Sequence, residues 1–386
     1  MKFLHTADWH VGRTIRGRSR ADEHQAVLAE LASIAREHEV DAVLVCGDVF
    51  DTAAPTPESE RVVYEGLLDL ASTGARVVVI AGNHDSDRRW QAVQPLLELG
   101  AIVTRPIFTD PSTSVVEVPS RDGRETMLVA ALPFLSQRWV VKASQLMSSE
   151  AAESVQLYEE RYRQLCDWLC ARFRSDTVNV VAAHAFVHGA EASGSERAAH
   201  LSAAYGVPAT VFPASAHYVA LGHLHRAQQI PGPCPIHYCG SPLQLDFGEA
   251  GQQKVALVVE ASAGTPARVT PVPLQSGRAL VNIEGTVDEL RARAESGGVD
   301  ASAYLRVQVR EKLRVGLADE ARDLFPNVVD VVLESSTSWS AGSGRDAEAR
   351  AGRSPRELFG AYLDDAGVRD DALTAFFDEL YEEVST

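Results

Sequence analysis

The chain has 386 residues, 45% of them hydrophobic and 23% charged, which is the balance of a globular protein with two or three domains. No apolar run reaches the roughly 20 residues of a membrane helix, and Asp8 comes too early for a signal peptide. Five cysteines are an odd and small number for a disulfide framework, so we expect a reducing, cytoplasmic location.

The formal net charge is −17, which differs from that of proteins that hold nucleic acid mainly through bulk electrostatics. The imbalance is uneven, because residues 355–386 hold nine carboxylates against two arginines. The charge of the whole chain therefore does not exclude a face that binds nucleic acid.

Strand and helix patterns alternate over the first two thirds of the chain. Apolar residues at helical spacing predict helices over 21–38 and 58–72, and Pro57 is well suited to the first turn of the second. A longer helix is predicted over 151–173. Strand–helix–strand alternation predicts a largely parallel sheet covered by helices. The predicted strands, all short and rich in Val, Ala and Ile, are residues 3–7, 40–46, 75–81, 177–183 and 217–221.

The pattern changes near residue 276, where a compact β-α-β-α-β unit is predicted up to residue 334. The next twenty residues are rich in Ser, Gly and Ala without an apolar period, which is typical of a flexible linker. Two short helices with apolar stripes are predicted beyond it. We therefore expect four parts: a large domain over 1–275, an α+β unit over 276–334, a linker over 335–354 and a helical segment over 355–386.

A polar cluster follows each of the five predicted strands directly. In an open α/β sheet, functional groups gather at the carboxyl ends of the strands, so the clusters should meet at one edge. One such cluster alone is more often a turn than a ligand set, but five at successive strand ends are typical of a metal site. The clusters are Asp8-Trp9-His10, Gly47-Asp48-Val49-Phe50-Asp51, Gly82-Asn83-His84-Asp85, His184 and Gly222-His223-Leu224-His225.

The ligand types indicate the kind of metal and the chemistry. Carboxylate, amide oxygen and imidazole, without thiolate, suit Mn²⁺, Fe²⁺ or Zn²⁺. Seven ligand-type side chains exceed the need of one ion and suit two ions about 3.5–4 Å apart, bridged by a carboxylate. Such a pair clamps a phosphate and activates water. We expect the glycines at 47, 82 and 222 to allow the sharp turns that aim the next side chains at the site.

The five clusters resemble the motifs of the calcineurin-like metallophosphoesterases: D-x-H, G-D-x-x-D, G-N-H-D, a lone His and G-H-x-H. The resemblance spans roughly residues 1–275. It is closest to the bacterial nuclease subunits of that family, because of residues 3–12, residues 47–52, and Gly240-Ser241-Pro242-Leu243 running into Asp246-Phe247-Gly248-Glu249. It implies a sandwich of mixed sheets flanked by helices, with a small α+β cap domain and a C-terminal helical segment.

The resemblance also implies the ligands of two metal ions, of which Mn²⁺ is the expected metal. The implied ligands form two groups with one carboxylate bridging them: Asp8, His10 and His225 for one ion, Asn83, His184 and His223 for the other, and Asp48 between the two.

His84 would be a histidine that binds no metal and that stabilises the transition state or protonates the leaving 3′-oxygen. Asp51 or Asp85 would orient it. Archaeal and eukaryotic relatives carry a histidine where this chain has Asp51. An aspartate at this position fits the bacterial branch, and it leaves the roles of the two aspartates open.

The implied activity is that of a DNA nuclease, exonucleolytic on double-stranded ends and endonucleolytic on single strands and hairpins, in DNA repair, recombination and replication. The implied partners are DNA, an SMC-like ATPase bound through the C-terminal helices, and a second copy of the chain. Basic residues after the first and third motifs either form a solvated face or contact the DNA backbone. These are Arg13, Arg16, Arg18, Arg20, Arg88 and Arg89.

Two other interpretations follow from the same residues. An enzyme of the same fold acting on a small phosphodiester or a phosphoprotein would need neither the cap nor the helical segment. A non-catalytic scaffold on a decayed site would lack ligands, and none of the seven is missing.

Overall fold

The computed structural model describes residues 1–136, 151–196, 205–312 and 314–333, together with Phe359, Leu363 and Phe377. It divides into two compact units. The first is Met1–Arg310 with Gly316–Val332, and the second is Glu311–Val315 with Leu333–Thr386. All the sheets described below belong to the first unit, apart from the last residue of β17.

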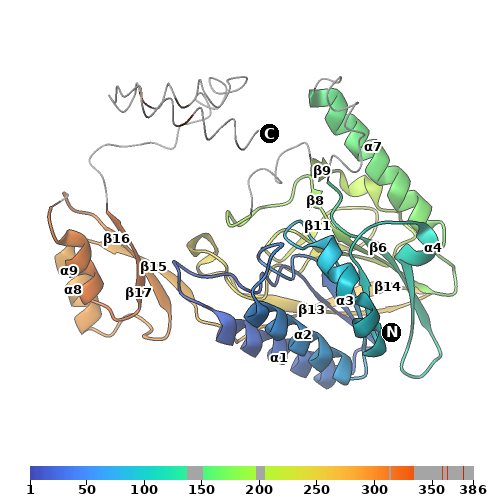
Figure 1. The fold of residues 1–386 in the computed structure, drawn as a ribbon, viewed down its shortest axis with the longest axis horizontal. Coiled ribbons are helices and arrows are strands. Elements are labelled where there is room, and N and C mark those ends of the chain that lie inside the picture. The colour runs from blue at the N-terminus through green and yellow to red at the C-terminus, as the bar shows by residue number, and fades with distance from the viewer. Residues whose placement is uncertain are drawn as a thin grey trace. The chain divides into compact units, whose positions relative to one another are not determined.

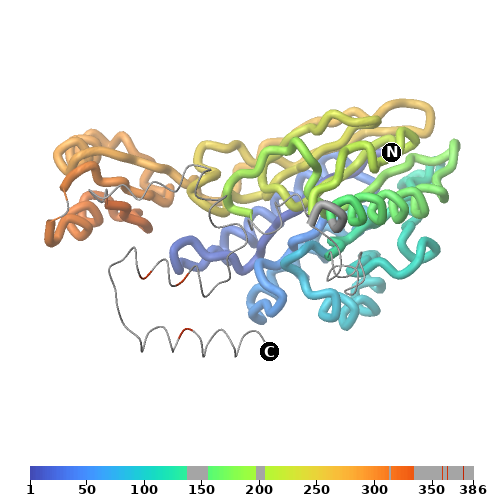
Figure 2. Tube along the Cα trace, turned by 90° about the horizontal axis from the view of Figure 1, so that it is seen from above, coloured from blue at the N-terminus to red at the C-terminus, as the bar shows by residue number. Residues whose placement is uncertain are grey.

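Six strands form the first sheet in the order β14-β13-β1-β2-β3-β4. Figure 1 shows β13 of this sheet with α1 and α2 beside it. β1 to β4 run parallel, because helices connect them, whereas β13 and β14 add an antiparallel hairpin beside β1. This pairing brings residues near 258 next to the N-terminus (Figure 2). The elements are β1 (Lys2–Thr6), α1 (Ala21–Glu37), β2 (Ala42–Cys46), α2 (Pro57–Ser72), β3 (Arg76–Ile80), α3 (Asp87–Leu99), β4 (Ile102–Arg105), β13 (Val255–Ser262) and β14 (Thr265–Pro273).

The second sheet has the order β11-β12-β10-β7-β6-β5. Its four inner strands are parallel, and β5 and β11 close its two edges as antiparallel strands. Its strands are β5 (Val115–Pro119), β6 (Thr126–Leu132), β7 (Val178–His184), β10 (Tyr218–Gly222), β11 (Gln228–Ile230) and β12 (Ile236–Tyr238). Around it lie α4 (Pro111–Ser114), α7 (Ala151–Cys170), β8 (Phe186–Val187), β9 (Gly206–Val207) and η3 (Ala209–Val211), and η4 (Phe247–Glu249) comes before β13 in the chain.

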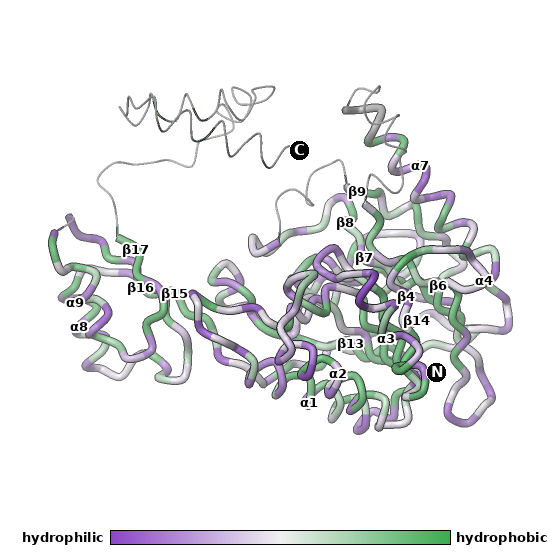
Figure 3. Tube along the Cα trace, viewed as in Figure 1, coloured by the Kyte–Doolittle hydropathy of each residue, from purple (hydrophilic) through white to green (hydrophobic). Residues whose placement is uncertain are grey.

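The two sheets stack face to face, so the molecule's main core has four layers. Phe3 and Leu44 of the first sheet pack against residues such as Val180 of the second. α1 and α2 cover the outer face of the first sheet, and α7 covers that of the second with side chains such as Tyr162. In Figure 3 the strands are mainly hydrophobic, whereas the covering helices alternate along their length.

This arrangement confirms the predicted sandwich of mixed sheets flanked by helices. The expectation of one largely parallel sheet from strand–helix alternation was wrong in part. Antiparallel strands such as β13 and β14 follow turns instead of helices. The five predicted strands and the helices over 21–38 and 58–72 lie within one or two residues of their observed bounds.

A third, three-stranded sheet has the order β15-β16-β17 and carries two helices. Its α8 begins with a capping box, in which Thr286 and Glu289 satisfy each other's backbone N–H groups. The observed order is the predicted β-α-β-α-β. The elements are β15 (Leu280–Gly285), α8 (Val287–Glu295), β16 (Tyr304–Val309), α9 (Leu317–Asp323) and β17 (Val328–Leu333).

The predicted linker over 335–354 lies outside the described residues, as does most of the predicted helical segment over 355–386. Within that segment Phe359, Leu363 and Phe377 are helical, and the rings of Phe359 and Phe377 stack with centroids 4.0 Å apart. None of the helices among the described residues is long and apolar enough to span a membrane.

Candidate metal centre

The predicted site residues converge at the carboxyl ends of five neighbouring strands. β1, β2 and β3 deliver their motifs from the first sheet, and β7 and β10 deliver theirs from the second. Backbone hydrogen bonds join the loops, with Asp8 N donating to Gly47 O and His10 N to Asp48 O. Seven of the nine aspartate and histidine side chains in these motifs are buried, and Asp51 and Asp85 are half-buried. The seven are Asp8, His10, Asp48, His84, His184, His223 and His225.

Four of these residues have backbone conformations that are rare for residues other than glycine. The φ angles are 54° at Asp8, 47° at His10, 48° at Asp48 and 107° at His223. Left-handed backbone at such residues costs about 1–3 kcal/mol each and is found where function requires it. The loops therefore hold these side chains in directions that an extended strand would not give.

Two glycines in the motifs serve close approach. A Cβ atom on Gly222 would lie 1.9 Å from the carbonyl oxygen of Cys46, and one on Gly82 would lie 2.1 Å from Oδ1 of Asp48. Neither adopts a positive φ, unlike Gly47 at 87°. The expectation of sharp turns thus holds for Gly47, whereas the other two make room for neighbouring loops.

The first group of candidate ligands is Asp8, His10 and His225, whose ligand atoms lie within 4.8 Å of one another. The Nε2 atoms of the two histidines are 3.1 Å apart. Each ring uses its other nitrogen elsewhere, since Nδ1 of His10 faces Asp51 at 3.2 Å and Nδ1 of His225 faces Ser195 at 2.6 Å. Two nitrogen lone pairs and a carboxylate therefore face one point, which is the donor set of a divalent cation.

The second group contains Asp48, His184 and His223, again within 4.8 Å. The amide oxygen of Asn83 lies 3.0 Å from Nε2 of His184 and 2.9 Å from Nδ1 of His223. Nδ1 of His184 donates to the carbonyl of Cys46 at 2.8 Å, which leaves Nε2 for a ligand. The predicted ligands of the second ion thus also share one position.

Burial and neighbouring charge shift the acidity of the ionisable groups. Burial raises the pKa of Asp8 to about 7, in spite of the nearby histidines. Burial alone would lower the pKa of His184, but the Asp48 carboxylate outweighs it and raises that pKa to about 9. Burial would raise the pKa of Asp48, but His184 and His10 hold it well below its usual range. Without ions, buried carboxylates thus draw protons onto their histidine partners, and cations would replace those protons.

His84 lies beside both groups. Its Nδ1 donates to the backbone carbonyl of Asp51 at 2.7 Å, and its backbone N–H donates to Asp48 at 2.8 Å. His10, Asp48 and His84 also lie within 4.8 Å, so distance alone would allow His84 as a ligand. Its exclusion from the ligand set stays a prediction.

The two candidate aspartates are differently placed. Asp51 orients His84 through its carbonyl, and its carboxylate pairs with His10 and with Arg13. The carboxylate of Asp85 accepts the backbone N–H groups of Gly82, Val49 and Phe50, and so ties two ligand loops together. Of these two aspartates, Asp51 is therefore the one that holds the ring of His84 by a hydrogen bond.

Sequence reasoning missed the residues behind the ligands. Ser195, Glu196 and Glu249 all contact His225: Ser195 and Glu249 face the ring, and Glu196 accepts the backbone N–H at 3.0 Å. Glu249 ends the Gly240–Glu249 run that carries part of the family resemblance. That run was the signal that could have pointed to it.

The structure changes the interpretation of the basic residues. Arg20 is buried and bonded to Glu23 and to the carbonyl of Gln244, so its side chain is not available to DNA. Arg16 pairs with Asp330, and Arg89 pairs with Glu60. Arg18 and Arg88 are exposed.

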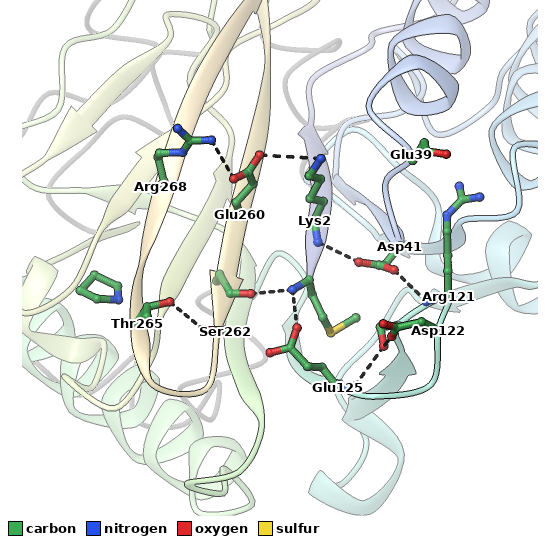
Figure 4. A pocket seen from close by; sticks show the side chains of 14 residues that line it. Lys2, Glu39, Asp41, Arg121, Asp122, Glu125, Glu260, Ser262, Thr265 and Arg268 are labelled. Atoms are coloured by element: carbon green, nitrogen blue, oxygen red, sulfur yellow. Dashed lines mark hydrogen bonds and ion pairs between the residues drawn. The ribbon is translucent and has the colours of Figure 1, made fainter.

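A hollow of about 670 Å³ lies at the opposite end of β1, away from the metal-site motifs. Its wall is strongly charged, and several of the charged side chains are already hydrogen-bonded or paired (Figure 4). Asp41 accepts the backbone N–H groups of Lys2 and Arg121, and Glu260 pairs with Arg268. None of the predicted ligands contributes to this wall.

Comparison with known proteins agrees with this geometry. The model of the calcineurin-like phosphoesterase family matches residues 1–227, which include all seven predicted ligands. The SbcD subunit of the nuclease SbcCD from Bacillus subtilis (strain 168) is 37% identical over 322 residues, covering 80% of this chain and 79% of its own. The chain belongs to the calcineurin-like phosphoesterases, in the family of the SbcD nuclease subunits.

Other relatives extend the comparison. The SbcD subunit of the nuclease SbcCD from Escherichia coli (strain K12) is 32% identical over 304 residues, covering 76% of this chain and 74% of its own. Among solved structures, a dimetal phosphatase from Danio rerio is 11% identical, with a TM-score of 0.40, and covers 72% of this chain and 99% of its own. The predicted family is thus confirmed by sequence relatives that span most of the chain.

Proposed function

We propose that the chain is the metal-dependent nuclease subunit of an SbcCD-type complex and hydrolyses phosphodiester bonds of DNA in repair, recombination and replication. The observation that carries this is the pair of converging ligand groups on either side of Asp48. Its Oδ2 lies 3.7 Å from Nε2 of His10 in one group and 3.4 Å from Nε2 of His184 in the other. A shared carboxylate between two such groups is the arrangement of a two-metal phosphoesterase.

The predicted ligands are divided between two proposed metal ions. One ion would be held by Asp8, His10 and His225, and the other by Asn83, His184 and His223, with Asp48 shared. Two divalent ions, for which we propose Mn²⁺, would supply an activated water and neutralise the charge of the phosphate. The left-handed backbone at Asp8, His10 and Asp48 supports this role, because it fixes the ligand directions before any ion binds.

His84 is proposed to move the proton. With Nδ1 committed to the carbonyl of Asp51, its Nε2 is the atom that can donate to the leaving 3′-oxygen or to a phosphate oxygen. Asp51 holds that ring, while Asp85 keeps the loops after β2 and β3 in register.

The proposed partners are DNA, the ATPase SbcC and a second copy of the chain, in the cytoplasm. For SbcC we propose the helical segment over 355–386, in which Phe359 and Phe377 stack. For the second copy we propose the surface of α2 and α3, where Leu68, Leu96 and Leu99 are exposed. We propose exonuclease activity on duplex ends and endonuclease activity on single strands and hairpins.

The test is Mn²⁺-dependent cleavage of linear duplex, hairpin and single-stranded DNA, alongside a small aryl phosphodiester. We expect the DNA substrates to be cleaved with far higher kcat/KM than the aryl ester, and chelation to abolish both activities. An enzyme that cleaves the aryl ester well and leaves every DNA substrate intact would favour the alternative, a phosphoesterase for small phosphodiesters or phosphoproteins.

A further inference from the structure

Two residues outside the predicted ligand set hold the ring of His225 from behind. Oγ of Ser195 lies 2.6 Å from Nδ1 of His225 and is also hydrogen-bonded to Oε1 of Glu249. The same carboxylate oxygen lies 3.3 Å from Nδ1. An ionised carboxylate only accepts, so Ser195 donates to Glu249 and accepts from the imidazole N–H. This fixes the tautomer of His225 that carries hydrogen on Nδ1 and a lone pair on Nε2.

The carboxylate of Glu249 is itself immobilised. Its side chain is 0% exposed, and it accepts from Nζ of Lys254 at 2.6 Å and from the backbone N–H of Leu245 at 3.1 Å. Lys254 also donates to the carbonyl oxygen of His225 at 2.9 Å. The Ser195 hydroxyl, the Glu249 carboxylate and the Lys254 ammonium therefore form one hydrogen-bonded network. This network contacts both the side chain and the backbone of His225.

A buried carboxylate in this place is not required by packing alone. Two other candidate histidine ligands are oriented differently, His184 by a backbone carbonyl and His10 by the partly exposed Asp51. A fully desolvated carboxylate is unfavourable unless it is paired, and here the pairing includes the ring of a candidate ligand. Groups that accept the second N–H of a metal-binding histidine typically raise metal affinity 10–100-fold.

We propose that Glu249 is a positioning residue of the metal centre, which acts through Ser195 to present Nε2 of His225 to a divalent cation. The inference rests on the proposed function, because it takes His225 as a ligand. It adds a role that the ligand motifs do not contain.

The experiment is calorimetric titration of the metal-free full-length chain with Mn²⁺, compared between the wild type and five variants. Glu249→Gln keeps the shape and removes the charge, and Ser195→Ala removes the bridging hydroxyl. We expect both to weaken one Mn²⁺ equivalent 10–100-fold and to leave the other unchanged. Ser195→Thr keeps a hydroxyl and should restore affinity to near the wild-type value.

The double variant separates action through Ser195 from two independent effects. If Glu249 works through that hydroxyl, Glu249→Gln combined with Ser195→Ala should bind Mn²⁺ about as weakly as Glu249→Gln alone. Glu23→Gln is the matched control, because it removes another largely buried carboxylate paired with a base, Arg20, away from the site. It should leave both Mn²⁺ equivalents as in the wild type.

The outcomes are distinguishable. Wild-type chain that binds no Mn²⁺ overturns the proposed metal centre itself. Wild-type chain that binds two equivalents, with folded Glu249→Gln binding both equally tightly, overturns only the role of Glu249. Additive effects in the double variant overturn the path through Ser195. If Glu249→Gln does not fold, the two Ser195 variants decide. Wild-type Mn²⁺ affinity in Ser195→Ala refutes the inference. A loss of Mn²⁺ affinity in Ser195→Ala that is absent in Ser195→Thr supports it.

Discussion

Oδ2 of Asp48 lies 3.4 Å from Nε2 of His184, although the two residues come from different sheets. β2 delivers the aspartate from the first sheet and β7 delivers the histidine from the second. The site is therefore assembled across the sandwich, and its geometry depends on how the two sheets stack. Substitutions in the core between the two sheets should therefore shift the positions of the ligands, even where the substituted residue does not contact a ligand.

Asp48→Asn should reduce Mn²⁺-dependent nuclease activity to background while leaving the chain folded. The substitution removes a charge shared by both proposed ions but keeps an oxygen that can accept the backbone N–H of His84. Cleavage of linear duplex DNA and circular dichroism measure the two effects. Asp41→Asn, far from the motifs and bonded to Lys2 and Arg121, is the control. Near-normal cleavage by folded Asp48→Asn would contradict the two-metal site.

His84→Gln should leave both Mn²⁺ equivalents bound and slow cleavage by about 10²–10⁴. The reason is that the predicted role of His84 is proton transfer and not coordination. Metal stoichiometry and single-turnover rates check this. His188→Gln is a suitable control, since that ring faces Glu159 outside the motifs. Loss of one metal equivalent in His84→Gln would instead make His84 a ligand, as the 4.8 Å grouping with His10 and Asp48 permits.

Acid should destabilise the chain partly through His5. Burial lowers the pKa of His5 to about 3, and its ring is bonded to Tyr218 and to the carbonyl of Leu221. The folded state therefore binds a proton more weakly than the unfolded chain. The stability that neutral His5 provides is complete above about pH 6.5 and is lost as the pH falls toward 3. Between pH 7 and 4.5 the loss should be on the order of 2–3 kcal/mol.

Urea unfolding of metal-free protein across that pH range tests the effect. His5→Gln cannot titrate, so its free energy of unfolding should fall less steeply with acid than that of the wild type. His38→Gln, at the partly exposed end of α1, should follow the wild type. Parallel pH profiles for wild type and His5→Gln would rule out the contribution of His5.

Removal of residues 355–386 should abolish co-purification with SbcC and leave Mn²⁺-dependent cleavage of a small aryl phosphodiester intact. Burying even part of the apolar stripes that contain Phe359 and Phe377 is worth several kcal/mol at about 25 cal/mol per Å². Pull-down with SbcC and the aryl ester assay measure the two effects. Unchanged binding of SbcC by the shortened chain would place the docking surface elsewhere, and unfolding would show that the segment supports its own chain.

Residue patterns predicted the ligand motifs because each sits directly after a strand with strong apolar character, as Asp48 does after β2. They did not reveal the second sheet as a separate layer, since its edge strands are short and its inner strands read like those of the first. Ser195 and Glu249 escaped prediction for another reason. A residue that orients a ligand needs only one hydrogen bond to it. The loops that connect such a residue to His225 can have any length, so no fixed sequence spacing marks it.

The cluster of Ile15, Phe247, Leu280 and Tyr304 has a consequence for dissecting the protein. The sequence suggests a domain border near residue 275, yet this cluster takes two residues from each side of it. Arg306 lies 4.5 Å from the ring of Phe247, and Asn282 donates to the carbonyl of the same residue. Shortening the chain to 1–275 would expose the ring of Phe247 to solvent, and Phe247 lies two residues before Glu249. The α+β unit over 276–334 is therefore less an independent domain than a cover for the turn that carries Glu249.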